Sequence, residues 1–128
     1  MNHLLQTMLA EYPLKKMQYR CLERHLNQNA AENVLRIMCD PEWYAYLRKR
    51  LSMLEKELSL LESAIDKLPD SLRETACMLL LEDASWDEAC ARMHISRMTL
   101  SRYRKQALEK LSEAFALHEQ EYIGFLLS

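Results

Sequence analysis

Glycine and proline are scarce in this sequence: one glycine and three prolines occur among 128 residues. Short hairpins are built on residues that tolerate a positive φ, glycine above all, so this scarcity leaves little room for a sheet made of hairpins. No stretch alternates apolar and polar residues with the β-branched enrichment of a strand. Leucine, methionine, alanine, glutamate, lysine and arginine, which favour helices, are plentiful. The composition therefore predicts an all-α protein.

Motifs of several functional classes are also missing. The only glycine is Gly124, so no glycine-rich loop can cradle phosphates, and no serine lies in a nucleophile elbow. We therefore expect neither enzymatic activity nor a cofactor. The sequence shows no secretory signal and no apolar stretch of membrane-spanning length, and its four cysteines are widely spaced without a C-x-x-C pair. These features predict a reduced, cytoplasmic protein with no membrane association.

Two cysteine–histidine pairs, Cys21 with His25 and Cys90 with His94, are each one helical turn apart. Side chains at i and i+4 lie on one face of a helix, where a cysteine and a histidine can share a zinc ion. Two such pairs would complete a tetrahedral site. The competing interpretation, which we prefer, is that Cys90 packs between helices and His94 faces solvent, so no metal is expected.

The first forty residues predict three short helices. Residues 2–11 form the first, which we expect Pro13 to interrupt, because proline lacks the N–H that a helix interior needs. A second helix is predicted over 14–27 and a third over 31–39, joined by a polar connection at 27–29.

A long helix with a heptad repeat is predicted next. Asp40, Pro41 and Glu42 combine an N-cap residue, a first-turn proline and a first-turn acid, which together favour a helix start. The apolar residues that follow recur at alternating steps of three and four: Tyr44, Leu47, Leu51, Leu54, Leu58, Leu61, Ile65 and Leu68. A mean spacing of roughly 3.5 residues is typical of a coiled-coil seam.

Two interpretations of this 44–68 stripe are open. It could be the seam of a homodimer, since the flanking charges begin basic at 48–50 and turn acidic at Glu55, Glu57 and Glu62, a polarity that suits antiparallel pairing. It could equally pack against the protein's own earlier helices, as in a helical bundle.

Residues 85–111 predict two helices joined by a tight corner. Ser85 with Glu88 forms a capping box at the start of the first helix, and Ser96 can cap the second after a short break. Apolar residues at helical spacing face inward from both helices: Ala89, Met93, Ile95, Leu100, Tyr103, Ala107 and Leu111. This layout is that of a helix-turn-helix.

The charge is segregated along the chain. The whole sequence carries a formal net charge of −2, which argues against non-specific coating of nucleic acid. Residues 96–111, however, hold five lysines and arginines against one glutamate, a net charge of +4, whereas 113–128 hold three glutamates and no lysine or arginine, a net charge of −3. The positive segment coincides with the second helix of the pair, which enters the major groove in a helix-turn-helix.

These residues resemble the last domain of sigma-70-type factors. The resemblance is carried by Ser85-Trp86-Asp87-Glu88-Ala89-Cys90, by Ile95-Ser96-x-x-Thr99-Leu100 and by Ala107-Leu108-x-x-Leu111. Leu68-Pro69-x-x-x-Arg73 is similar to the helix that opens that domain, so the match runs from Leu68 to Ser112. The chain as a whole is most similar to small phage transcriptional activators of the RinA and ArpU type.

The sequence departs from the sigma pattern at His94, where the family usually has the corner glycine, and at Cys90, which replaces a small alanine between the helices. A residue at that corner must tolerate or avoid a positive φ, and histidine is among the residues enriched there. Cysteine behaves as a small buried hydrophobe, so the second change is mild. Arg104 also occupies an often apolar position, where Tyr103 can supply the core contact.

The resemblance and the outward positions of the second helix together predict the DNA contacts. One set of side chains is expected to face base edges in the major groove: Arg97, Met98, Ser101 and Arg102. A second set is expected to hold phosphates: Thr99, Arg104, Lys105 and, by resemblance, Arg73. An arginine of the first set could bridge a guanine with two hydrogen bonds.

The sequence thus predicts two regions: a helical oligomerisation or interaction region over 1–67 that ends in the long heptad helix, and a sigma-region-4-like helix-turn-helix domain with a helical tail over 68–128. The implied function is sequence-specific binding of double-stranded DNA to regulate transcription, by resemblance as a phage or prophage activator. The first region would set homodimer geometry or contact RNA polymerase. Two alternatives are a phage small terminase subunit, which would form a large ring, and a sigma-like interaction module that binds no DNA.

Overall fold

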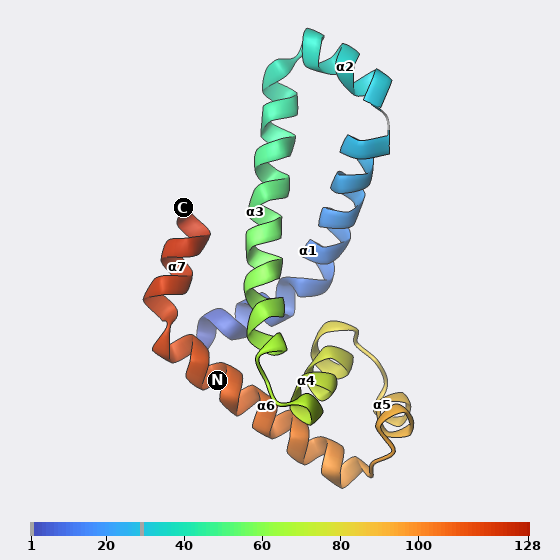
Figure 1. The fold of residues 1–128 in the computed structure, drawn as a ribbon, viewed down its shortest axis with the longest axis vertical. Coiled ribbons are helices and arrows are strands. Elements are labelled where there is room, and N and C mark those ends of the chain that lie inside the picture. The colour runs from blue at the N-terminus through green and yellow to red at the C-terminus, as the bar shows by residue number, and fades with distance from the viewer. Residues whose placement is uncertain (1, 29) are drawn as a thin grey trace.

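The computed structural model describes residues 2–28 and 30–128, and their regular structure is entirely helical, which confirms the all-α class. The elements in chain order are α1 (His3–Gln28), α2 (Ala30–Cys39), α3 (Pro41–Asp66), α4 (Asp70–Ala76), the π-helical segment η1 (Cys77–Leu81), α5 (Trp86–Met93), α6 (Arg97–Leu117) and α7 (Glu119–Leu127). Figure 1 shows a long hairpin of α1 and α3, closed at its tip by α2, with α6 running across its base. None of the described helices is long and apolar enough to cross a membrane.

The first helix, α1, runs without interruption through Pro13, so the predicted break into two helices is wrong. Proline removes one backbone hydrogen bond and collides with the preceding turn, which kinks a helix rather than ending it when packing holds both sides. Leu5 and Tyr12 are buried before Pro13, and Figure 1 shows α1 bending along its length. The helix extends to Gln28, into the predicted connection, whose last residue, Asn29, lies outside the described residues.

The heptad helix α3 begins where the sequence predicts. The carboxylate of Asp40 accepts a hydrogen bond of 3.0 Å from the backbone N–H of Trp43, which satisfies one of the free donors of the first turn. Pro41 is the first helical residue, where its missing N–H costs nothing. The short helix predicted before this cap is also present, as α2.

The second half of the heptad stripe packs inside the chain. Four of its side chains on α3 are buried: Leu54, Leu58, Leu61 and Ile65. Leu58, Leu61 and Ile65 belong to a core that also holds side chains of α1, and α1 runs antiparallel to α3 along the hairpin (Figure 1). Tyr44, Leu47 and Leu51, nearer the tip, are only half-buried. Packing against the protein's own helix therefore accounts for the second half of the stripe, and a homodimer seam stays a prediction.

Ion pairs fix the register of the hairpin. The ammonium of Lys15 lies 2.6 Å from Glu57, and that of Lys16 lies 2.8 Å from Glu62, so two consecutive lysines of α1 each reach a carboxylate of α3. The hydroxyl of Tyr12 donates a further hydrogen bond of 2.8 Å to Glu62. The side chains of these ion pairs are 21–38% exposed, and charge pairs this shielded from water are screened less than pairs at an open surface.

The main core lies where the base of the hairpin meets α4 and α6. Its buried side chains come from four helices and the α3–α4 link: Leu5, Met8, Tyr12, Leu58, Leu61, Ala64, Ile65, Leu68, Leu72, Ala76, Ala107, Leu111 and Phe115. Phe115 of α6 and Leu5 of α1 are completely buried in it. One core therefore takes side chains from both sides of the predicted boundary between residues 67 and 68.

The C-terminal segment forms a short helix, α7, that lies beside α3 (Figure 1). The Tyr122 ring meets Phe115 edge to face at 5.0 Å, and the ammonium of Lys56 on α3 donates to the backbone carbonyl of Ser128. Docking is partial, because Leu127 keeps 82% of its surface exposed. The basic α6 and the acidic α7 remain distinct segments, as the charge pattern indicates.

Candidate nucleic-acid interface

A second, smaller core holds the two helices of the predicted DNA-reading pair. Met78 from η1, Ala89 from α5 and Leu100 from α6 are its buried members. Half-buried residues pack around them, among them Cys90, which supports its predicted role between the helices. Ala107 and Leu111 continue the buried face of α6 into the main core. The inward residues predicted for this helix are thus confirmed.

The start of α5 is capped by Ser85, which is the N-cap half of the predicted capping box. The hydroxyl oxygen of Ser85 accepts a hydrogen bond of 3.1 Å from the backbone N–H of Glu88, one of the two bonds of a capping box. Just before it, η1 ends at Leu81, Glu82 is its C-cap residue, and Asp83 has a φ of 53°. The helix therefore stops before these two acidic residues, whose negative charge is unfavourable at a helix C-terminus.

The corner between α5 and α6 is built on His94. This residue has φ 56° and ψ 45°, in the left-handed region, and its N–H donates to the carbonyl of Cys90. The sequence predicts that a residue here must tolerate or avoid a positive φ, and His94 tolerates it. Ser96 then caps α6 by accepting a bond of 3.2 Å from the backbone N–H of Thr99. The left-handed His94 and the Ser96 cap together turn the chain within three residues.

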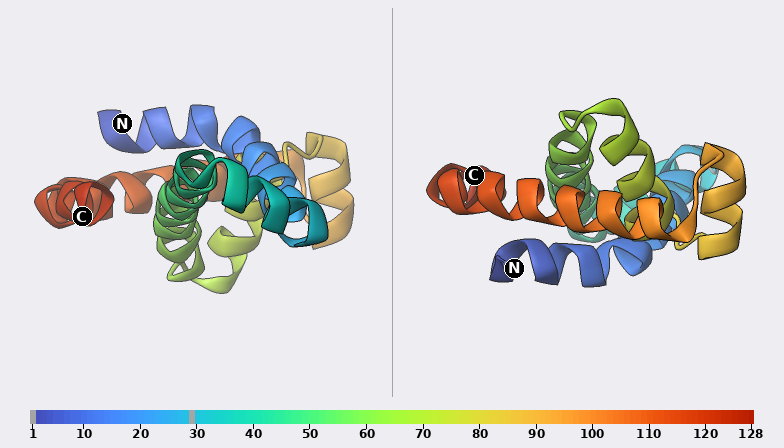
Figure 2. Two further views of the ribbon diagram at one scale, coloured as in Figure 1. Left: turned by 90° about the horizontal axis from the view of Figure 1, so that it is seen from above. Right: turned by 90° about the horizontal axis from the view of Figure 1, so that it is seen from below.

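The predicted base-reading residues gather on the exposed face of α6. In Figure 2 (right), α6 lies across the face of the molecule turned toward the viewer. Arg97 has 67% of its side chain exposed and Met98 has 83% of its surface exposed. Ser101 and Arg102 are exposed as well. The guanidinium of Arg102 lies 5.7 Å from the centre of the Tyr103 ring, a cation–π contact that limits its freedom.

The predicted phosphate-binding residues divide into two places. Arg104 and Lys105 are exposed on α6, and Thr99, half-buried, accepts a hydrogen bond of 3.1 Å from the hydroxyl of Ser96. Arg73 lies on α4, bonded to Asp70 at 2.8 Å, in a separate hollow that also contains Arg92. The structure thus brings the α6 residues together and leaves Arg73 apart from them.

One residue of this surface was missed by the sequence reasoning. Asp87, in the first turn of α5, accepts two hydrogen bonds from Arg97, from Nε at 3.2 Å and from Nη2 at 2.8 Å. These bonds, and then the attraction of the carboxylate, raise the pKa of Arg97 above its ordinary, already high value. Nothing in the sequence period signals this contact, because the two residues are ten apart and lie on different helices.

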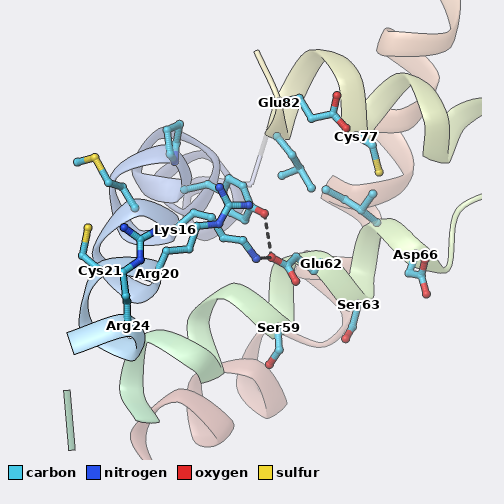
Figure 3. Close-up of a pocket in the computed structure, with 15 residues that line it drawn as sticks. Lys16, Arg20, Cys21, Arg24, Ser59, Glu62, Ser63, Asp66, Cys77 and Glu82 are labelled. Carbon is cyan, nitrogen blue, oxygen red and sulfur yellow. Dashed lines mark hydrogen bonds and ion pairs between the residues drawn. The ribbon is translucent and has the colours of Figure 1, made fainter. Parts of the chain in front are cut away.

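A hollow of about 910 Å³ lies elsewhere, between α1, α3 and η1. Figure 3 shows Lys16, Arg20 and Arg24 along its α1 wall, with Glu62 and Asp66 on the opposite wall. The bonds from Tyr12 and Lys16 to Glu62 cross its floor. Since basic and acidic walls face each other, this groove offers no continuous positive surface to a DNA backbone.

The cysteine–histidine pairs form no metal centre in the part of the chain that the structure describes. Among those residues, no three histidine, cysteine, aspartate or glutamate side chains are grouped so that they could hold an ion. The four cysteines are free thiols, with Cys21 and Cys39 exposed and Cys77 and Cys90 half-buried.

Comparison with known proteins identifies no relative of this chain: no protein family, no curated protein and no solved structure matches it. The function therefore has to be argued from the residues and geometry above.

Proposed function

We propose that this protein is a sequence-specific DNA-binding regulator of transcription that inserts the start of α6 into the major groove. The observation that carries the proposal is the α5–α6 corner. Its left-handed residue, His94, and the Ser96 cap present an α6 start whose apolar face is buried and whose outer face is basic and exposed. A helix held this way can enter a groove about 12 Å wide while the rest of the fold stays outside.

Charge supports the same surface. The first turn of α6 contains no acidic residue, and its backbone N–H groups form the positive end of the helix dipole. Arg97, Arg102, Arg104 and Lys105 lie within nine residues and are all exposed. Phosphates surround a groove-bound helix on both sides, so an acidic helix would be repelled where this one is attracted.

We assign base reading to Arg97, Ser101 and Arg102, because they lie in the first two turns of α6. Arg104 and Lys105 lie further along α6 and hold backbone phosphates. Thr99 and the N-terminus of α6 together hold a further phosphate. Arg73 remains a phosphate candidate by resemblance alone, because it lies on α4 in a separate hollow.

The resemblance to sigma-70 region 4 and to RinA- and ArpU-type proteins supports a more specific proposal. The chain would be a cytoplasmic phage or prophage activator whose N-terminal half contacts RNA polymerase near a promoter or sets dimer geometry. Apolar side chains at the hairpin tip are available for a protein partner: Val34, Leu35 and Met38 of α2 keep 55%, 64% and 77% of their surfaces exposed. The same observation also favours the alternative of an interaction module that binds no DNA.

Selection of bound duplexes from a random DNA pool, repeated at two salt concentrations, tests the proposal. We expect one enriched motif and an affinity that falls steeply with salt, because phosphate binding releases counterions. An enriched motif with two-fold symmetry would indicate a dimer. A large ring in light scattering would favour the terminase alternative, and no salt-dependent binding to any duplex would favour the interaction module.

A pair of double variants sharpens this test. Arg97→Ala with Arg102→Ala should weaken binding to the selected duplex by at least tenfold, since each bidentate arginine–guanine contact is worth roughly 1–3 kcal/mol. Arg20→Ala with Arg24→Ala removes the same charge from exposed arginines on α1 and should leave binding almost unchanged. Equal losses in the two double variants would mean that only total charge matters, which would contradict recognition by α6.

A further inference from the structure

Asp87 contacts Arg97, and this contact indicates a role for Asp87 that its charge and exposure alone do not suggest. Asp87 comes from the first turn of α5 and Arg97 is the first residue of α6, so the pair spans the corner. A single carboxylate oxygen, Oδ1, accepts from both Nε and Nη2 of the guanidinium. One edge of Arg97 is therefore fully occupied before any ligand arrives.

The unoccupied edge of Arg97 matches one base. A guanidinium has five N–H donors in a rigid plane, and Asp87 engages those on the Nε side. The remaining Nη1–H and outer Nη2–H form a parallel pair at the end of the side chain. Guanine presents two acceptors, O6 and N7, to such a pair in the major groove, whereas adenine replaces O6 by the N6 amino donor.

From this geometry we infer that Asp87 is a specificity-determining residue, which orients Arg97 so that it reads a guanine at one position of the DNA site. The inference rests on the proposed function of α6. An arginine held in place before binding loses less side-chain freedom when it meets the base, and it cannot turn to engage a phosphate instead. Asp87 favours guanine because it fixes one orientation of the Arg97 guanidinium. It disfavours the other bases because it excludes the orientations that would be needed to bind them.

The exposure of the pair separates this role from a structural one. The side chains of Arg97 and Asp87 are 67% and 83% exposed. Ion pairs this exposed contribute little to folding, so the pair is not needed to hold the corner together. Asp87 is also a negative charge beside the DNA-facing surface, and its removal should strengthen non-specific binding. Loss of Asp87 should thus weaken base discrimination while leaving or raising affinity for unrelated DNA.

The test uses the full chain and the duplex selected from the random pool. The position read by Arg97 is the one at which Arg97→Ala relaxes the selected base, and there we expect guanine. At that position, wild type should prefer guanine over adenine by about tenfold or more. Asp87→Ala should reduce that preference by about fivefold and should not weaken binding to a scrambled duplex, because a coupled pair contributes on this scale.

Two controls complete the experiment. Glu88→Gln removes a charge from the same turn of α5, at an exposed residue with no bond to Arg97, and should keep the guanine preference. In an Arg97→Ala background, Asp87→Ala should have no further effect on base preference, because the two residues act as one unit.

The inference is overturned if Asp87→Ala keeps the guanine preference or if Glu88→Gln reduces it equally. It is also overturned if Asp87→Ala and Arg97→Ala have additive effects on base preference. It also fails if Arg97→Ala relaxes no position, an outcome that removes Arg97 from the base-reading set but leaves sequence-specific DNA binding by α6 intact. If wild type enriches no motif at all, the proposed function and the inference fail together.

Discussion

At the scale of single residues, the α5–α6 corner depends on His94, which holds a left-handed conformation without being glycine. That conformation costs an ordinary residue roughly 1–2 kcal/mol, and a β-branched residue more. We expect His94→Val to lower the free energy of unfolding by about 1–2 kcal/mol, whereas His94→Gly and His94→Asn should leave it nearly unchanged or slightly raised. Urea unfolding measures this difference, and equal effects of glycine and valine would contradict the role of the corner.

A second residue-scale prediction concerns pH. Burial, and then the hydrogen bond to Glu62, raise the pKa of Tyr12 well above its ordinary value. In the unfolded chain tyrosine ionises near pH 10, while in the folded chain Tyr12 stays protonated. The stability that this group contributes is therefore complete below about pH 10 and is lost as the pH rises further.

The measurement compares wild type with Tyr12→Phe. The free energy of unfolding should be about 1 kcal/mol higher in wild type at pH 8, the typical net value of a hydrogen bond. That difference should shrink as the pH rises above 10, because only the wild-type unfolded state gains by ionising Tyr12. Tyr46→Phe, which alters a tyrosine with 66% of its surface exposed, is the control and should show no such trend.

At the scale of elements, the start of α6 depends on one cap. Ser96→Ala removes the acceptor for the Thr99 N–H and should lower the free energy of unfolding by about 1 kcal/mol. Ser101→Ala, in the same helix but exposed and past the first turn, should be neutral or slightly stabilising, because alanine favours helices. Thermal unfolding followed by circular dichroism would show the contrast, and similar losses for both variants would mean that the cap contributes nothing specific.

At the scale of elements, the features that could be predicted are those encoded by a short stretch of sequence. Caps at Asp40, Ser85 and Ser96 depend on a side chain and an N–H three residues away, so a short stretch of sequence contains all the information. The inward residues of α6 follow from the helical period. The break at Pro13 was predicted wrongly because its effect depends on packing from distant residues, which the local sequence does not show.

Contacts between distant residues could not be predicted from the sequence for the same reason. Tyr12 and Glu62 are fifty residues apart, and Asp87 and Arg97 lie on two different helices. No periodicity relates such pairs, because their geometry is set by how helices cross. The candidate surface on α6 could therefore be predicted residue by residue, whereas the carboxylate that orients its first arginine could not.

At the scale of the whole molecule, the N-terminal hairpin and the α6 surface share one core. Side chains of α1 and α3 meet those of α4 and α6 around Phe115. A protein partner at the hairpin tip and a DNA duplex on α6 would thus be held in a defined relative geometry, because the core that fixes one also fixes the other.

This shared core predicts that both halves unfold in one transition. The two tryptophans provide a probe for each half, Trp43 on α3 and Trp86 on α5. In variants with one tryptophan replaced by phenylalanine, the remaining fluorescence should change at the same urea concentration as the helical circular dichroism of that variant. Phe115→Ala should lower the free energy of unfolding by about 3–5 kcal/mol and shift both probes together. Two separate midpoints, or a shift confined to Trp86, would mean that the hairpin folds independently of the α6 region.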